Sequence, residues 1–259
     1  MYEEIKLRHD NYVSTIVLSN PPLNLITVRM VSELGTAFDT LADRLDTRCV
    51  VIRGEGARAF SAGADLDEVR SDTSGTVGMH ADAGRALVAR FESFPKPIVA
   101  AIQGWCIGGG TGLAWPADIR VAATSARFRA GDVYLGTIPQ WGVGMERLVH
   151  YIGRNRALDV LLLGEDLSAA EAHVLGLVSM VVPDDEFEAT VERVASRLSG
   201  GAPLAMAAIK DGVKAQYEAN LPGAAKCALR WANKVRESQD TVEGIVAFRE
   251  KRTPEFQGR

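Results

Sequence analysis

Residues 49–66 read CVVIRGEGARAFSAGADL and residues 97–110 read PIVAAIQGWCIGGG, and these two stretches decide the fold. In both, a nearly continuous apolar run is followed by a segment of small, glycine-containing residues. Such an apolar run is typical of a strand that is buried on both faces of a parallel sheet. Because a long helical pattern separates the two stretches, we predict an α/β protein built from alternating strands and helices.

The rest of the chain extends this alternation and then becomes helical. Further strand patterns cover residues 13–18 and 119–122, and a helical pattern covers residues 27–45. The later helical patterns are 142–151, 155–163, 168–175, 184–198, 203–217 and 222–250. Ser168 and Glu171 form a capping-box pattern, which predicts a helix start. No Gly/Ser/Pro-rich linker interrupts the chain, so we expect one core over residues 1–200 and a helical region over residues 201–259.

Composition and charge exclude several classes of partner. The 259 residues carry a net charge of −4 without a dense stripe of Lys or Arg, so binding to nucleic acid or to an anionic membrane is not expected. No targeting segment opens the sequence, and no run approaches the roughly 20 apolar residues of a membrane span. Cys49, Cys106 and Cys227 are widely separated and lack metal-ligand spacing. We therefore expect a cytoplasmic protein with reduced cysteines and no metal site.

The two glycine-containing segments are the candidate functional feature. Small residues let the backbone approach a ligand closely, and each segment leads into a predicted helix whose first amides lack intrahelical partners. Two such turns can direct two amide donors at one oxygen, which is how an oxyanion hole stabilises charge on a carbonyl. Taken alone, each segment also fits tight packing of a helix on a sheet. Neither has the glycine spacing of a P-loop or a dinucleotide-binding turn.

Five segments, in order, resemble the signature segments of the enoyl-CoA hydratase/isomerase (crotonase) superfamily. They are AFSAGADL (59–66), KPIVAAIQGWCIGGG (96–110), ARFRAGDVYLGTIP (126–139), LLLGEDLSAAEAHVLGLVSMVVP (161–183) and EGIVAFREKRTPEF (243–256). The resemblance covers essentially the whole chain. It implies a spiral of ββα units over residues 1–200 and a C-terminal helical trimerisation region over residues 201–259. It also implies a homotrimer or a hexamer.

The resemblance assigns expected roles to individual residues. The amides of Ala64 and Gly109 match the pair that binds the thioester oxygen of an acyl-CoA, and Asp132 matches a position that bears a catalytic glutamate. Coenzyme A would be part of the substrate, so no separate cofactor is expected. The residues expected to contact the substrate are Ala62, Asp65, Leu66, Gly108, Gly112, Gln140, Trp141, Phe248 and Lys251. Of these, Phe248 and Lys251 match positions that touch the nucleotide end from a neighbouring subunit.

The sequence departs from a hydratase at both glutamate positions. A hydratase of this superfamily places two glutamates around one water, and paired carboxylates suit that task because each shifts the pKa of the other. Here the first position is Gly112 and the second is Asp132. Asp132 alone resembles the single-carboxylate chemistry of Δ3,Δ2-enoyl-CoA isomerases, although an aspartate in this context also fits a turn. Gln140 and Trp141 are expected at the acyl end, where Trp141 fits either an acyl wall or core packing.

We therefore expect an enzyme that stabilises an enolate of an acyl-CoA thioester, with isomerase-like proton transfer by Asp132. Three alternatives use the same binding site. These are a hydratase with a replacement acid, an acyl-CoA decarboxylase or hydrolase, and a non-catalytic acyl-CoA binder. Fold alone does not distinguish them, because function depends on the site rather than on the scaffold.

Overall fold

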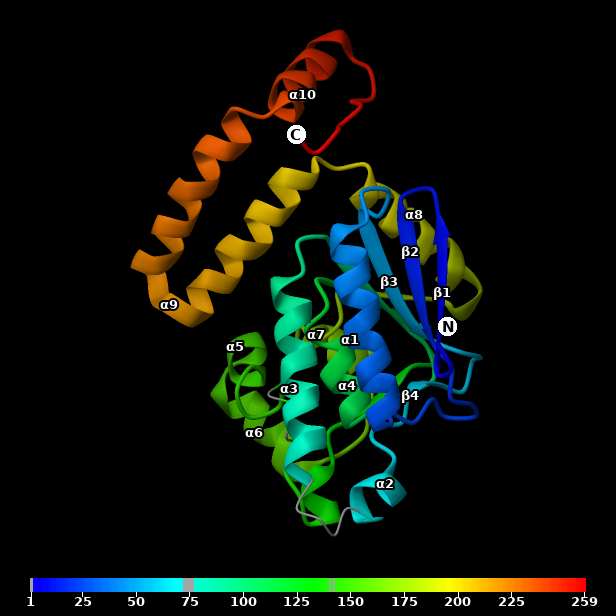
Figure 1. The fold of residues 1–259 in the computed structure, drawn as a ribbon. Helices are drawn as coiled ribbons and strands as arrows, with labels where there is room; N and C mark the ends of the chain where they lie inside the picture. Colours follow the sequence, from blue (N-terminus) through cyan, green and yellow to red (C-terminus); the bar gives the residue numbers. More distant parts are fainter. Residues whose placement is uncertain (1, 72–76, 140, 142) are drawn as a thin grey trace.

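The computed structural model describes residues 2–71, 77–139, 141 and 143–259, and it contains two sheets with helices packed around them (Figure 1). The larger sheet has the strand order β1-β2-β3-β5-β7-β10. Its strands are β1 (Ile5–Asp10), β2 (Val13–Leu18), β3 (Cys49–Gly54), β5 (Ile98–Ile102), β7 (Ile119–Ala123) and β10 (Met180–Val182). Only β1 and β2 are antiparallel neighbours, and all other neighbouring strands are parallel.

The smaller sheet shows why the fold is a repeat of ββα units. Its order is β4-β6-β8-β9, with β4 (Ala59–Ser61), β6 (Trp105–Ile107), β8 (Arg127–Arg129) and β9 (Leu167–Ser168). Each of β3, β5 and β7 in the larger sheet is followed by β4, β6 or β8 in the smaller one, and helical structure comes next. The predicted α/β class and ββα spiral are confirmed. Equivalent turns of successive units therefore lie on the same side of the molecule.

Helices cover both faces of the larger sheet. The helices of the whole fold are α1 (Val28–Asp43), α2 (Leu66–Ser71), α3 (Val77–Ser93), α4 (Gly109–Ala114), η1 (Asp132–Leu135), α5 (Leu148–Ile152), α6 (Arg154–Leu163), α7 (Ala169–Val174), η2 (Asp184–Glu186), α8 (Phe187–Ser199), α9 (Pro203–Arg236) and α10 (Gln239–Glu250). On β3, Val50 and Ile52 belong to the core shared with α1 and α3, whereas Cys49 and Val51 pack with α8. Strand side chains alternate between faces, so this two-sided burial explains the continuous apolar run.

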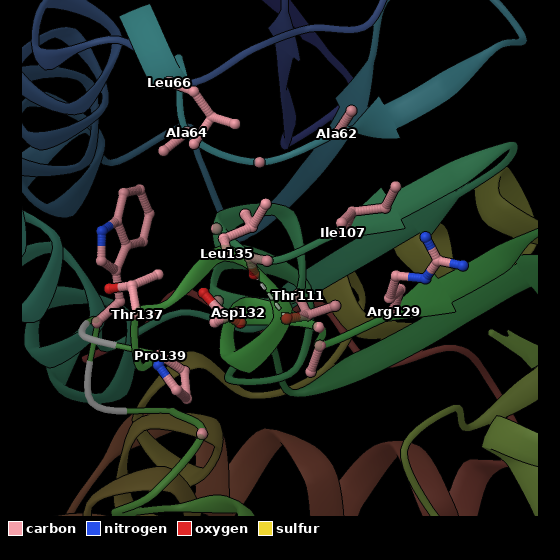
Figure 2. A pocket seen from close by; sticks show the side chains of 18 of the residues that line it. Ala62, Ala64, Leu66, Ile107, Thr111, Arg129, Asp132, Leu135, Thr137 and Pro139 are labelled. Atoms are coloured by element: carbon pink, nitrogen blue, oxygen red, sulfur yellow. Dashed lines mark hydrogen bonds between the residues drawn. The ribbon is translucent and has the colours of Figure 1, made fainter. Parts of the chain in front are cut away.

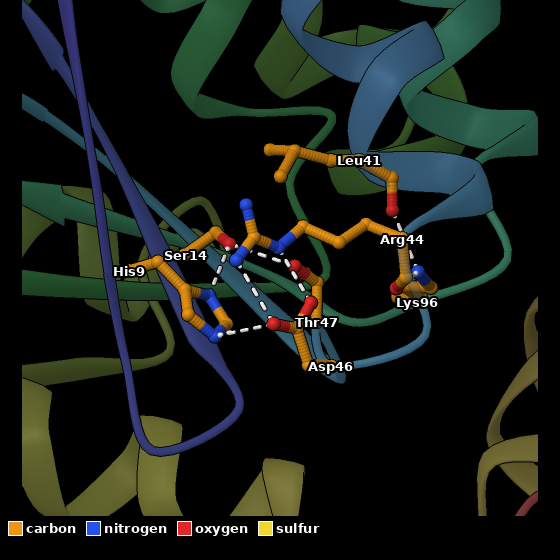
Figure 3. A network of polar contacts seen from close by, with 7 residues as sticks. All are labelled: His9, Ser14, Leu41, Arg44, Asp46, Thr47 and Lys96. Atoms are coloured by element: carbon orange, nitrogen blue, oxygen red, sulfur yellow. Dashed lines mark hydrogen bonds and ion pairs between the residues drawn. The ribbon is translucent and has the colours of Figure 1, made fainter.

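The C-terminal end of α1 is fixed by a lysine from another part of the chain (Figure 3). The Lys96 ammonium donates to the carbonyl oxygens of Leu41 at 2.6 Å and Arg44 at 2.7 Å. Both carbonyls lie at the end of the helix, where backbone acceptors lack intrahelical partners and a cation is favourable. Nearby, the buried hydroxyls of Ser14 and Thr47 share a hydrogen bond of 2.8 Å. These contacts hold α1 against the edge of the larger sheet.

Helices α9 and α10 form an arm that extends away from the two sheets, and α10 lies at the opposite end of the molecule from α2 (Figure 1). The arm coincides with the predicted helical region over residues 201–259. Its role in oligomerisation stays a prediction. Among the residues described, no helix combines the length and hydropathy that a membrane span requires.

Several predicted boundaries differ from the structure. The helical pattern over 64–94 contains two helices, α2 and α3, and α9 runs through the predicted break between residues 217 and 222. Strand β1 was not predicted, because IKLRHD is mostly polar and only Ile5 is fully buried. An edge strand of this kind lacks the apolar run that identifies a central strand. The capping box of Ser168 and Glu171 at the start of α7 is confirmed.

Candidate active site

A cavity of about 1140 Å³ lies where the turns after β4 and β6 meet the segment after β8. It brings together residues that are up to 141 positions apart in the chain, from Leu23 to Gly164. The predicted site residues that line it are Ala62, Ala64, Asp65, Leu66, Gly108, Gly109, Gly112, Asp132 and Trp141. In Figure 2 the Asp132 side chain lies in the space beneath the segment that carries Ala62 and Ala64. The cavity therefore unites the two glycine-containing segments with Asp132.

The turn after β4 directs the Ala64 amide into this cavity. The Ile26 amide donates to the Gly63 carbonyl at 2.8 Å, and the Asp65 amide donates to the Ile26 carbonyl at 3.0 Å. Because backbone groups alternate in direction along an extended segment, the amide of Ala64 between them faces away from Ile26. Gly63 has a φ of +97° and a β-carbon there would lie 2.9 Å from the Ile107 oxygen, so only glycine suits this position.

The turn after β6 directs a second amide to the same place. Gly108 has a φ of +49°, and α4 begins at Gly109. A β-carbon on Gly109 would lie 3.5 Å from the Ala64 nitrogen, and one on Gly63 would lie 3.5 Å from the Gly109 nitrogen. Within the described ranges, neither the Ala64 nor the Gly109 amide donates to another protein group. Two converging donors at a helix start can stabilise a developing oxyanion.

Asp132 contributes a buried carboxylate to the cavity. It begins η1, the short helix over Asp132–Leu135, and its Oδ2 is buried with no hydrogen-bond partner among the described residues. Burial raises the pKa of the Asp132 carboxyl above its ordinary value, since the low-dielectric surroundings disfavour the charged form. An unpartnered buried carboxylate oxygen with a raised pKa is a feature of proton-transfer sites. Among the described residues, Asp132 Oδ2 makes no turn-capping contact.

The side chain of Trp141 occupies the space next to Gly112. Trp141 is 8% exposed, and a β-carbon on Gly112 would lie 3.3 Å from its Cε3 atom. A β-carbon on Gly109 would lie 3.7 Å from its Cη2 atom, so the ring extends from Gly112 to the amide pair. On the other side, Gly84 of α3 faces the ring so closely that a β-carbon would be 2.5 Å from Cδ2. The indole therefore forms a wall of the cavity and is also packed in the core.

The charged groups at the rim are mostly engaged in local contacts. The Asp65 carboxylate accepts the Asp67 amide at 2.9 Å and so caps the start of α2. Arg129, which sequence analysis did not identify, lines the cavity and pairs with Asp166 at 2.7 Å. Gly84 was missed as well, although a glycine in the interior of a helical pattern is a signal of close packing. Ile26, a third unpredicted residue, orients the Ala64 amide through its backbone.

Two predicted contacts, Phe248 and Lys251, do not line this cavity in the single chain. Phe248 lies on α10 and is 84% exposed, and Lys251 caps that helix in a left-handed conformation. Neither residue lines the cavity. Both belong to the arm at the other end of the molecule, so one chain cannot bring them to the site by itself. Gln140 lies outside the described residues.

The chain is similar to known proteins over nearly its whole length. The sequence profile of the family described as enoyl-CoA hydratase/isomerase matches residues 8–259. A probable enoyl-CoA hydratase of Bacillus subtilis (strain 168) is 36% identical over 260 residues, covering 98% of each chain. The 2,3-dehydroadipyl-CoA hydratase of Escherichia coli (strain K12) is 35% identical over 258 residues, covering 99% of each. A crystal structure of enoyl-CoA hydratase from Bacillus anthracis superposes with a TM-score of 0.95 at 31% identity, covering 99% of this chain and 100% of that one.

Proposed function

The chain belongs to the enoyl-CoA hydratase/isomerase family and is an enzyme of acyl-CoA thioesters, and on that premise we propose that it transfers a proton through the single carboxylate of Asp132. The observation that carries this proposal is that, among the described residues, no second carboxylate stands at the other glutamate position of a hydratase. The position that would bear it is Gly112, and the indole of Trp141 lies against that glycine. The substrate class follows from the family, and the buried Asp132 carboxyl in the cavity supports its assignment as the proton-transfer group.

The amides of Ala64 and Gly109 bind the thioester oxygen in this proposal. Removing a proton next to a thioester places negative charge on its carbonyl oxygen. Preorganised amides stabilise that charge, and loss of one donor from such a site typically costs about 10²- to 10³-fold in rate. The helix start at Gly109 adds the positive end of a short helix dipole. Support for this role comes from the convergence of both nitrogens on one point of the cavity.

Asp132 then moves one proton between two carbons of the acyl chain. With a 3-enoyl-CoA, the carboxylate removes a proton from C2, and the electron pair passes through the carbonyl to give a dienolate. The protonated carboxyl returns the proton to C4, and the double bond moves from C3–C4 to C2–C3. The raised pKa of Asp132 favours both halves, because a base whose pKa lies nearer neutrality also serves as a useful acid. Coenzyme A leaves as part of the product, so no separate cofactor takes part.

The arm supports the proposal that the enzyme is a homo-oligomer, as a trimer or hexamer. Large apolar side chains are exposed along α9 and α10, namely those of Ile209, Val213, Leu229, Val242, Ile245 and Phe248. An extended surface of this kind on two helices is typical of an interface between subunits. A neighbouring subunit would then bring its own Phe248 and Lys251 to the nucleotide end of coenzyme A. Residues 201–259 serve as the oligomerisation region in this arrangement.

The test is a side-by-side assay of purified enzyme with a 3-enoyl-CoA and with crotonyl-CoA. We expect the 3-enoyl ester to become the conjugated 2-enoyl ester, followed by absorbance and mass spectrometry. Asp132→Asn keeps the shape of the side chain but removes its basicity, and it should abolish turnover while acyl-CoA binding by calorimetry is unchanged. Equal turnover by Asp132→Asn would refute the assignment. Binding without turnover in both proteins would identify a non-catalytic acyl-CoA binder.

Hydration is a second candidate, because the Bacillus subtilis and Escherichia coli relatives are both named as hydratases. It would require a replacement for the missing acid. The same assay separates the two reactions, since hydration increases the mass of crotonyl-CoA by one water and removes its conjugation. Asp132-dependent hydration of crotonyl-CoA at a rate matching or exceeding isomerisation would favour the second candidate.

A further inference from the structure

Gly84, Gly109 and Gly112 together make the space that the indole of Trp141 fills. A β-carbon at residue 84 would overlap the ring, at 2.5 Å from both Cδ2 and Cε2. At residue 112 a β-carbon would press on Cε3 at 3.3 Å and would contact the Trp141 Cβ at 3.7 Å. The ring is therefore held between α3 and α4, and its tip reaches the neighbourhood of Gly109. Three separate glycines accommodate one aromatic side chain.

This packing crowds an acidic side chain at residue 112. The first carbon of such a side chain already meets the ring at a distance tighter than ordinary van der Waals contact. The ring would have to move by a few tenths of an ångström to admit that carbon, and a buried aromatic ring in a close-packed interior resists such a shift. The lack of a carboxylate and the position of Trp141 are thus two parts of one arrangement.

The same ring changes the polarity of the cavity beside Asp132. In a two-carboxylate site, one water lies between the acids. A water held in a cavity needs two to four polar partners as well as space. Here the cavity that Asp132 lines is also formed by the glycine backbone and by the Trp141 ring, and its walls include Leu135, Ile138 and Val143. An indole face supplies no hydrogen bond to a water on that side.

We propose that Trp141 determines the reaction outcome by excluding the attacking water, and that Gly84 and Gly112 are the positions that allow the indole to do so. This inference rests on the proposed function, since it assumes that Asp132 is the proton-transfer group. It makes Trp141 a specificity-determining residue that acts through volume and polarity. A smaller side chain at residue 141 opens a water-sized space between Gly112 and the substrate double bond.

The reaction expected when residue 141 is smaller is the addition of water to a 2-enoyl-CoA. Asp132 would take one proton from the water, the oxygen would bond to C3, and the electron pair of the double bond would pass to the thioester oxygen. The protonated Asp132 would then give its proton to C2. Every atom of the water enters the product, and no oxidant or further co-reactant is needed. A carboxylate restored at residue 112 would hold and orient the water.

The experiment compares the ratio of hydration to isomerisation in the wild-type enzyme and four variants. Trp141→Phe retains an aromatic wall and serves as the matched control, whereas Trp141→Ala and Trp141→Leu open the space to different degrees. The fourth variant combines Trp141→Ala with Gly112→Glu. We expect the ratio to stay low for the wild type and Trp141→Phe, and to rise for Trp141→Ala and Trp141→Leu. The combined variant should gain about a further 10²-fold, the contribution of one positioned acid or base.

The outcomes separate this inference from the proposed function. Some variants will remain folded by circular dichroism and bind acyl-CoA. If the ratio of hydration to isomerisation is unchanged in all of these, the role of Trp141 is overturned, even when the wild type isomerises its substrate. A wild-type enzyme that hydrates as fast as Trp141→Ala would overturn it as well. If the wild type does not isomerise, the proposed function fails, yet hydration that appears in Trp141→Ala, Trp141→Leu or the combined variant and not in Trp141→Phe would still support the role of Trp141. Trp141→Leu keeps the test valid if the alanine variant does not fold.

Discussion

The backbone nitrogen of Ala64 lies 3.5 Å from the point where a β-carbon on Gly109 would be, although 45 positions separate the two residues in the chain. The amide of Ala64 is directed by Ile26, and that of Gly109 by the start of α4. This convergence defines where the thioester oxygen would bind. It also identifies the single atom whose addition should disable the site.

Gly109→Ala should therefore reduce kcat/KM by about 10²- to 10³-fold, the typical effect of losing one oxyanion donor. The new methyl group would stand in front of the Ala64 amide and would meet Ile26 Cδ1 at 3.3 Å. Steady-state kinetics measures the effect. Gly212→Ala on α9 is the control, because nothing lies within 4 Å of a β-carbon there. Comparable kinetics for both variants would argue against an oxyanion site at this position.

The activity should depend on pH through Asp132. The carboxylate form is the base, and burial raises the pKa of Asp132 above the ordinary value of 3.8. We expect kcat/KM to rise with pH, with an acid limb whose midpoint lies above 3.8. A pH–rate profile measures this midpoint. An acid limb at or below 3.8 would contradict a desolvated base.

The raised pKa of Asp132 should also make the protein less stable as the pH rises, whereas activity should increase. The folded state holds the Asp132 proton more tightly than the unfolded state, so the contribution to the free energy of unfolding is fully present below the unfolded pKa. That contribution is lost as the pH rises through the higher folded-state pKa. Asp132→Asn should therefore be more stable than the wild type at neutral pH, and the difference should vanish at low pH. Urea unfolding at several pH values tests this, and a wild type that gains stability relative to the variant as pH rises would contradict it.

Gly84 and Trp141 should be energetically coupled. Gly84→Ala inserts a methyl group into the space of the indole, and such overpacking typically destabilises a protein by about 1–3 kcal/mol. In the background of Trp141→Leu the same change should cost much less, because the smaller side chain leaves room. Denaturant unfolding of the four proteins in this double-mutant cycle gives the coupling free energy. Additive effects would show that the ring does not occupy this space.

Lys210 should anchor the arm to the core. Its ammonium donates to the Asp118 carboxylate and to the Lys96 carbonyl, and only 11% of its side chain is exposed. Lys210→Met leaves the partly buried Asp118 without its cation, which should lower the free energy of unfolding by about 1–3 kcal/mol. Lys226→Met, at an exposed position of the same helix, is the matched control and should change stability by less than about 0.5 kcal/mol. Equal effects of the two changes would exclude an anchoring role.

Phe248 should contribute to assembly. Its ring is 84% exposed in the single chain, and we expect sedimentation to show a trimer or a hexamer. Phe248→Asp should shift the distribution towards smaller species, because a carboxylate is costly in an apolar interface. Leu45→Asp is the control, since Leu45 is also exposed, at 94%, but lies in the loop after α1. A monomeric wild type, or the same shift for both variants, would refute an interface on α10.

Most of the core could be predicted from local patterns. The apolar runs of β2, β3, β5 and β7 and the capping box of α7 are short segments whose own residues specify their conformation. Strand β1 could not be found in this way, because its polar side chains tolerate water and its backbone is ordered by pairing with β2.

The sequence by itself determined the alternation of strands and helices, the two glycine-containing turns and the presence of Asp132 without a second acid at residue 112. These features depend on apolar periodicity and on backbone conformations that only glycine adopts freely, and both are local properties. Only the tertiary structure decided that Trp141, rather than substrate or water, fills the space beside Gly112, and that Gly84 makes this possible. The physical reason is that close packing depends on the shapes of side chains from several elements at once, and no single segment contains that information.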